Sequence, residues 1–115
     1  MIVELVTFRA PAGADWNAIL EGAKATLPHW QANPKLVRKH YLLSEDGQTC
    51  AGLYIWPTRA DAEHAHNAAW QEAVEARTGA RPTFRYFDLQ ILLDNEAGTV
   101  TEWSRNGEKR VSKVS

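Results

Sequence analysis

Four segments of the chain have the composition and alternation of β-strands. Residues 2–8 are β-branched and aromatic, which is typical of a first strand. Residues 35–44 and 49–56 read as two further strands, and the Asp-Gly pair between them, at 46 and 47, is a strong hairpin signal. Residues 83–93 predict one long last strand.

Apolar residues spaced by three and four positions predict two helices between these strands. The first begins at a candidate N-cap, Asp15, and ends at Asn33-Pro34. Its inward stripe is expected to be Trp16, Ile19, Leu20, Ala23, Leu27 and Trp30. The second runs over roughly residues 59–77, after a capping-box-like Thr58, and ends at Gly79. Its stripe is expected to be Ala62, Ala65, His66, Ala69, Trp70, Ala73 and Val74.

The order of elements is β-α-β-β-α-β, which predicts an α+β fold of the ferredoxin-like type over residues 1–93. In this fold two helices cover one face of a four-stranded antiparallel sheet. The first and last strands carry large apolar residues on both faces, whereas a half-solvated sheet normally alternates. We therefore expect the uncovered face to meet a second copy of the chain, giving a homodimer.

Residues 94–115 form a polar tail whose four acidic and four basic residues cancel. Asn106-Gly107 lies between two strand-like runs and predicts a β-hairpin in which Trp103 faces Arg110. A two-stranded ribbon alone is marginal. Two alternatives stay open: the tail is frayed, or it docks on a neighbouring subunit.

Composition narrows the class of protein. Thirteen Lys and Arg against fourteen Asp and Glu argue against nucleic-acid binding. A single cysteine and an N-terminus without a signal-peptide pattern predict a cytoplasmic protein, and no apolar run is long enough for a membrane helix. The count that stands out is five tryptophans, which need a core, a ligand pocket or a partner to cover them.

The central hairpin is the first candidate site. With Asp46-Gly47 as its loop, alternation places Lys39, Tyr41, Tyr54 and Trp56 on one face. Gly52 would lie across from Tyr41 and leave a gap for a ligand, walled by aromatic rings with an amine nearby. The alternative is that the rings simply pack under a helix. If the face assignment is reversed, Arg38 and His40 replace Lys39 and Tyr41.

His66 is the second candidate, one turn before Trp70 on the second helix, where the two rings would stack. A histidine held against tryptophan is a candidate proton acceptor, although an interior hydrogen-bonded histidine is the plainer interpretation. His64 and His66 point about 200° apart on a helix, so the pair does not predict a metal site.

Several stretches of the chain carry a family resemblance. They are Lys39-His40-Tyr41-Leu42, then Ala51-Gly52-Leu53-Tyr54-Ile55-Trp56, then an alanine-rich helix with Trp70, and a closing Phe87-Asp88. Together they resemble the YdhR-like monooxygenases. These belong to the dimeric α/β-barrel superfamily, with the antibiotic-biosynthesis monooxygenases. The resemblance implies a homodimer, a ligand cavity between helices and sheet, and an oxygenase that needs no metal, haem or flavin. Haem-degrading relatives have Asn on the first strand; Thr7 and the lack of Asn there disfavour that activity.

The resulting hypothesis is a monooxygenase without cofactors, acting on a small aromatic or polyketide-like molecule. His66 would accept a proton and Lys39 would stabilise an anionic substrate oxygen, while Tyr41, Gly52, Tyr54, Trp56 and Trp70 would form the binding wall. Three alternatives remain: a non-catalytic ligand-binding or stress-response module, an isomerase or lyase on the same fold, and a structural protein with no cavity.

Overall fold

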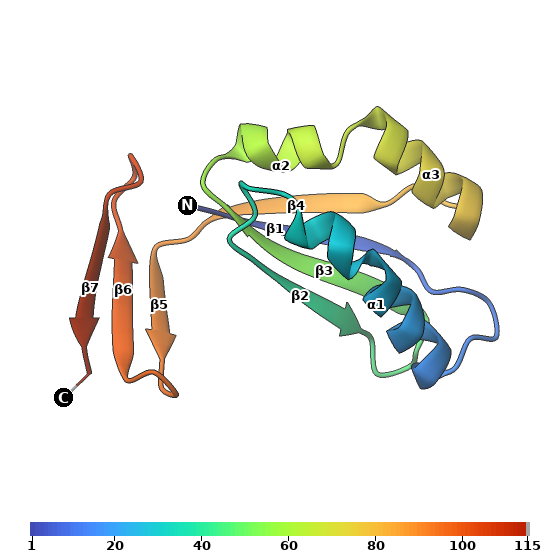
Figure 1. Ribbon diagram of the computed structural model, residues 1–115, viewed down its shortest axis with the longest axis horizontal. Coiled ribbons are helices and arrows are strands. Elements are labelled where there is room, and N and C mark those ends of the chain that lie inside the picture. Colours follow the sequence, from blue (N-terminus) through green and yellow to red (C-terminus); the bar gives the residue numbers. More distant parts are fainter. Residues whose placement is uncertain (115) are drawn as a thin grey trace.

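The computed structural model describes residues 1–114; Ser115, the last residue of the predicted tail, lies outside the described part. Its main body is a four-stranded antiparallel sheet in the order β2-β3-β1-β4, with helices on one face (Figure 1). The strands are β1 (Ile2–Arg9), β2 (Arg38–Leu43), β3 (Thr49–Trp56) and β4 (Thr83–Asp88). This arrangement confirms the ferredoxin-like fold.

The first two helices begin at the side-chain caps that the sequence predicts, and the third ends at the predicted C-cap. Helix α1 (Trp16–Gln31) starts where the Asp15 carboxylate accepts from the Ala18 N–H at 2.9 Å. Helix α2 (Arg59–Ala65) starts at Thr58, whose hydroxyl accepts from the Asp61 N–H at 3.2 Å. Helix α3 (Ala68–Thr78) ends at Gly79, which is in the left-handed region with φ 82°.

The single second helix predicted over residues 59–77 is wrong, because the chain breaks between α2 and α3. His66 has φ −103° and ψ 51°, outside the helical region. Asn67 starts a new helix by accepting from the Trp70 N–H at 3.0 Å. The His66 carbonyl, freed by the break, accepts from the Gln71 side-chain amide at 2.9 Å. The break therefore leaves few backbone groups without a hydrogen bond, and it places His66 outside the helix.

The register of the central hairpin is as predicted. Leu43 pairs with Cys50, Tyr41 with Gly52 and Lys39 with Tyr54. Tyr54 and Trp56 are buried on the face that the helices cover. Arg38 and His40 point to the other face and are exposed, so the reversed assignment does not apply.

The predicted inward stripe of α1 is correct only at its C-terminal end. Trp30 is buried, whereas Trp16 is 68% exposed and Leu20 is 40% exposed. The helix approaches β2 near its C-terminus, where the Thr26 hydroxyl lies 2.8 Å from the Tyr41 hydroxyl. The reason is geometric. The spacing of apolar residues shows which side of the helix faces the sheet, but it does not show along how much of its length the helix contacts the sheet.

In the described part of the chain, no helix covers the outer face of the sheet (Figure 1). That face carries alternate positions of all four strands. Leu42 and Phe87 there are 44% and 46% exposed. The apolar members of this outer face are Val3, Leu5, Leu42, Ala51, Leu53, Ile55 and Phe87. A large apolar surface of this kind is typical of an interface.

The long last strand predicted over residues 83–93 is wrong, because the chain turns at Leu89 and Gln90. Strand β4 ends at Asp88, and β5 (Ile91–Asp94) starts a second sheet with β6 (Thr99–Trp103) and β7 (Lys109–Lys113). This C-terminal sheet stands to one side of the main body (Figure 1). The backbone N–H of Leu89 donates to the Met1 carbonyl at 3.0 Å. This bond takes the place of further β1–β4 strand pairing where the chain turns.

The β6–β7 hairpin exists, but its predicted register is wrong by one residue. Trp103 pairs with Lys109, and Arg110 pairs with Glu102. The Ser104 hydroxyl oxygen accepts from the Glu108 N–H at 2.9 Å, and Gly107 has φ 90°. A loop of residues 104–108, closed by this side chain, therefore replaces the expected two-residue turn.

None of the helices within residues 1–114 combines the length and the apolar character needed to cross a lipid bilayer.

Candidate functional site

A buried carboxylate and imidazole form the centre of the site. Glu4 on β1 is 0% exposed and His66, at the α2–α3 break, is 2% exposed. The His66 Nδ1 atom lies 2.9 and 3.0 Å from the two carboxylate oxygens of Glu4. The Trp56 indole N–H donates to the same carboxylate at 2.9 Å. One acidic group thus holds side chains from β3 and from the helix break in fixed positions.

Glu4 is not among the site residues predicted from the sequence. Its signal was present: Glu4 lies between Val3 and Leu5 in a β-branched, apolar strand, on the same face as Ile2 and Val6. A carboxylate on the core face needs hydrogen-bond donors, because burying it unpaired is costly. The donors come from residues 52 and 62 positions away, which no local pattern reveals.

The contact with Glu4 sets the proton position on His66. An ionised carboxylate only accepts, so the facing Nδ1 atom must carry a hydrogen. The lone pair of neutral imidazole is then on Nε2. That atom is buried and finds no hydrogen-bond partner within residues 1–114. An orphaned, oriented ring nitrogen is suited to accept a proton from a bound molecule.

Aromatic rings enclose His66. Trp70 lies 4.4 Å from it between ring centroids, at an interplanar angle of 70°, so the pair meets edge to face and the predicted stacking is wrong. The other ring centroids near His66 are those of Tyr54 at 4.6 Å, Trp30 at 5.2 Å, Phe84 at 5.7 Å and Trp56 at 6.3 Å. Aromatic rings therefore surround the imidazole that carries the orphaned nitrogen and shield it from bulk water.

Two phenols near Glu4, those of Tyr54 and Tyr86, have raised pKa values. Burial, with the nearby charge of Glu4, raises the pKa of Tyr86 to about 12. The same two causes, burial first, raise the pKa of Tyr54 above its usual range. A phenol with a raised pKa is a poor base near neutral pH. The groups left to move protons at this site are His66 and Lys39.

The Lys39 ammonium lies in a box of rings. Its Nζ atom is 3.8 Å from the centroid of Tyr41, 4.5 Å from Trp30 and 4.7 Å from Tyr54. Ring faces attract an ammonium, whereas burial disfavours its charge. Burial lowers the pKa of Lys39 to about 7.

A cleft of about 250 Å³ opens between α1 and β2 beside this box. Five of its nine lining residues are apolar or aromatic, and two others are cations. The lining residues are Leu27, Trp30, Gln31, Asn33, Leu36, Val37, Arg38, Lys39 and Tyr41. Neither His66 nor Trp70 lines it, so the cavity lies beside Lys39 rather than beside the histidine. Trp30 contacts both Lys39 and His66, and its ring separates the cleft from the buried pair.

The gap predicted above Gly52 is filled. A Cβ atom placed on Gly52 would lie 2.6 Å from Cε1 of Tyr54, so the Tyr54 ring occupies the space. Gly52 therefore serves the packing of a neighbour two residues along the same strand. Of the predicted wall residues, Tyr41 lines the cleft, while Tyr54, Trp56 and Trp70 surround His66.

We expect Gly52→Ala to lower the free energy of unfolding by about 1–3 kcal/mol, because the buried Tyr54 ring must shift to admit a methyl group. Urea denaturation measures this. Gly22→Ala is the control: its Cβ would meet nothing within 4 Å in α1, and we expect a gain of about 0.5–1 kcal/mol. Equal stability of the two variants would contradict the packing role of Gly52.

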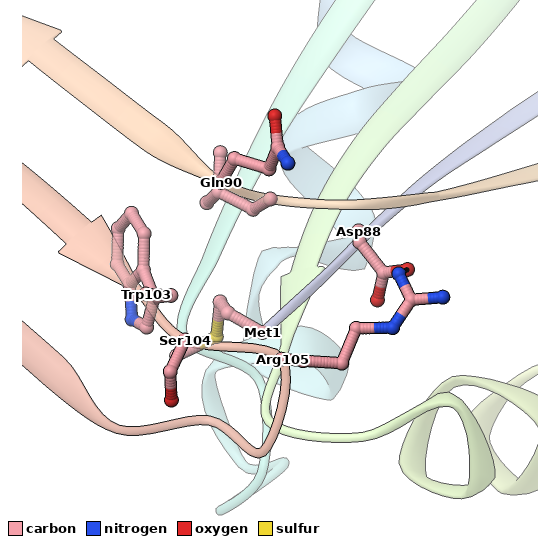
Figure 2. A pocket seen from close by; sticks show the side chains of 7 residues that line it. Met1, Asp88, Gln90, Trp103, Ser104 and Arg105 are labelled. Carbon is pink, nitrogen blue, oxygen red and sulfur yellow. Dashed lines mark hydrogen bonds and ion pairs between the residues drawn. The ribbon is translucent and has the colours of Figure 1, made fainter.

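A second, smaller pocket of about 110 Å³ lies where the C-terminal sheet joins the main body. Figure 2 shows Met1 and Trp103 on its walls and the Arg105 guanidinium beside the Asp88 carboxylate, at 3.3 Å. The backbone N–H of Trp103 donates to the Gln90 carbonyl at 2.9 Å. None of the residues predicted for the site lines this pocket, so we assign it to the junction of the two sheets.

Comparison with known proteins shows which fold this is. No family model matches the sequence, and no curated protein matches it. A monooxygenase from the gene ActVA-Orf6 of Streptomyces coelicolor, in complex with nanaomycin D, has a TM-score of 0.61 and 18% identity over 80% of this chain and 89% of its own. An antibiotic biosynthesis monooxygenase has a TM-score of 0.57 and 12% identity over 77% of this chain and 98% of its own. Rv0793 from Mycobacterium tuberculosis has a TM-score of 0.55 and 13% identity over 82% of this chain and 97% of its own. The chain therefore shares the fold of the antibiotic biosynthesis monooxygenases.

Proposed function

We propose that this protein is a monooxygenase that needs no metal, haem or flavin and acts on a small aromatic or polyketide-like molecule. The observation that carries the proposal is the buried Glu4–His66 pair, whose Nε2 atom has no partner within the described chain. The shared fold supports it, since a structural neighbour is a monooxygenase in complex with nanaomycin D. We also propose that the chain is YdhR-like within this fold.

His66 is the proton acceptor in this proposal, and Glu4 is its positioning residue. The carboxylate holds the imidazole in one tautomer and stabilises the imidazolium that forms when Nε2 takes a proton. The surrounding rings exclude water, which strengthens this electrostatic effect and protects a reactive anion. Deprotonation makes the aromatic substrate electron-rich enough to react with dioxygen directly.

The substrate enters through the cleft beside Lys39. Trp30 forms the wall between that cleft and His66, so access to Nε2 requires this ring to move. The Lys39 ammonium then lies beside the deprotonated oxygen of the substrate and stabilises its charge. Tyr41 and Trp30 hold the substrate ring by stacking.

The oxygen balance needs no external reductant. For a hydroquinone, one atom of dioxygen becomes a new hydroxyl on the ring, the other leaves as water, and the substrate itself is oxidised to the hydroxyquinone. Proton transfer and positioning are the tasks left to the protein.

The test is oxygen uptake with hydroquinone-type polycyclic phenols, with ¹⁸O₂ and mass spectrometry to count incorporated atoms. We expect uptake with one labelled atom per product, and a loss of about 100-fold or more in His66→Ala because general-base catalysis is removed. His64→Ala, on the same helix end but exposed, is the matched control and should keep the full rate. Uptake that His66→Ala leaves unchanged would refute the assigned base.

Two other outcomes identify the alternatives. A molecule that binds in the cleft but is never converted would favour a non-catalytic ligand-binding module. Conversion without oxygen uptake would favour an isomerase or lyase that uses the same His66 for proton transfer.

We also propose that two chains dimerise through the outer face of the sheet, which the helices leave uncovered. The support is the apolar outer face, where Leu42 and Phe87 are each more than 40% exposed. Packing two such sheets removes this surface from water, at about 25 cal/mol per Å² of apolar area.

A further inference from the structure

Lys39 has the surroundings of a reactive amine. Three rings lie within 4.7 Å of its Nζ atom, and its side chain is partly buried among them. Lysine is seldom buried without an acidic partner. The Lys39 Nζ atom makes no ion pair and no hydrogen bond with any of residues 1–114, although Lys24, another lysine of the chain, pairs with Glu21.

The cleft beside Lys39 also lacks acidic groups. Its one other charged lining residue is Arg38, which is a cation as well. Desolvation favours the neutral form of an amine, and this is one way in which lysine nucleophiles are activated in enzymes. Burial lowers the pKa of Lys39 to about 7, so a large share of the side chain is neutral near pH 7.

The shape of the cleft selects the partner of this amine. Leu27, Trp30, Leu36 and Tyr41 give it apolar and aromatic walls, and about 250 Å³ suits a ligand smaller than most drugs. A flat ring system with one or two rings fits this chemistry. An electrophilic group on that ring system would lie against the Nζ atom.

We propose that Lys39 forms an imine with the carbonyl carbon of an aromatic aldehyde or ketone bound in this cleft. The amine nitrogen adds to the carbonyl carbon, a C=N bond replaces the C=O bond, and the carbonyl oxygen leaves as water with both amine hydrogens. No oxidant is needed, so the reaction is separate from the oxygenase proposal, in which Lys39 stays an ammonium.

The test is reductive trapping under nitrogen at pH 7. The protein is incubated with 2-naphthaldehyde and sodium cyanoborohydride, which reduces an imine to a stable secondary amine, and peptide mass spectrometry locates the adducts. We expect at least about tenfold more adduct on Lys39 than on Lys24 or Lys35, because burial favours the neutral, nucleophilic form of the Lys39 amine. Mapping separates the N-terminal amine, which also reacts.

Two variants and a second probe complete the test. Lys39→Arg keeps the positive charge but cannot form the imine, so the adduct at this position should disappear while the fold, checked by circular dichroism, stays intact. Lys24→Arg is the matched control and should leave the Lys39 adduct unchanged. Even labelling of all lysines would overturn the proposal. Labelling of Lys39 by propanal as strong as that by 2-naphthaldehyde would overturn the aromatic preference.

The trapping experiment is done without oxygen. A failure to trap an imine on Lys39 therefore does not affect the oxygen-uptake result for His66, and a failure of oxygen uptake does not affect the trapping result. The two proposals can therefore be judged separately.

Discussion

Glu4→Leu is expected to lower the free energy of unfolding by at least about 2 kcal/mol. The substitution removes the acceptor for two buried donors, the His66 imidazole and the Trp56 indole. Each buried donor left without a partner costs about 1–3 kcal/mol. For a chain of this size the melting temperature should fall by roughly 10 °C. Urea or thermal denaturation followed by circular dichroism measures both.

Two variants test this explanation. Glu21→Leu removes an exposed carboxylate from α1 and is expected to change stability by less than about 0.5 kcal/mol. The double variant Glu4→Leu with His66→Leu removes a donor together with the acceptor, and should recover part of the loss. If Glu4→Leu is as stable as Glu21→Leu, the buried pair does not support the core.

Leu53→Glu is expected to weaken the proposed dimer by at least about 100-fold in dissociation constant. Leu53 lies on β3 at the middle of the outer face, next to Leu5 of β1. In a face-to-face dimer the substitution would bury carboxylates of like charge, and such pairs cost several kcal/mol. Sedimentation equilibrium at micromolar concentration measures the change.

Leu20→Glu is the control for the dimer. Leu20 is 40% exposed on α1, on the helix side of the sheet, and its substitution should leave the dimer intact. Wild-type protein that remains a single chain at micromolar concentration would refute the dimer. So would equal association of the wild-type protein and Leu53→Glu when both are folded.

Local signals were sufficient for most of the fold. The Asp15 cap, the Gly79 C-cap and the hairpin register from Leu43–Cys50 to Lys39–Tyr54 are correct, because each depends on residues close in sequence. Alternation along the hairpin also placed Lys39 and Tyr41 on one face with Tyr54, and the structure shows that this is the face toward the helices. The break after α2 had a signal as well, since Asn67 is a good N-cap, but the apolar spacing ran across it and favoured one helix.

The sequence by itself therefore determined the order of the elements of the main sheet, the caps at Asp15, Thr58 and Gly79, and which residues of the central hairpin share a face. Tertiary structure alone decided that Glu4 joins His66 and Trp56, that the Tyr54 ring fills the space above Gly52, and that the chain leaves the main sheet at Leu89. The physical reason is distance along the chain. A cap or a two-strand register is settled by neighbours, whereas a buried charge and a ring position are settled by partners brought together only when helices and sheet pack.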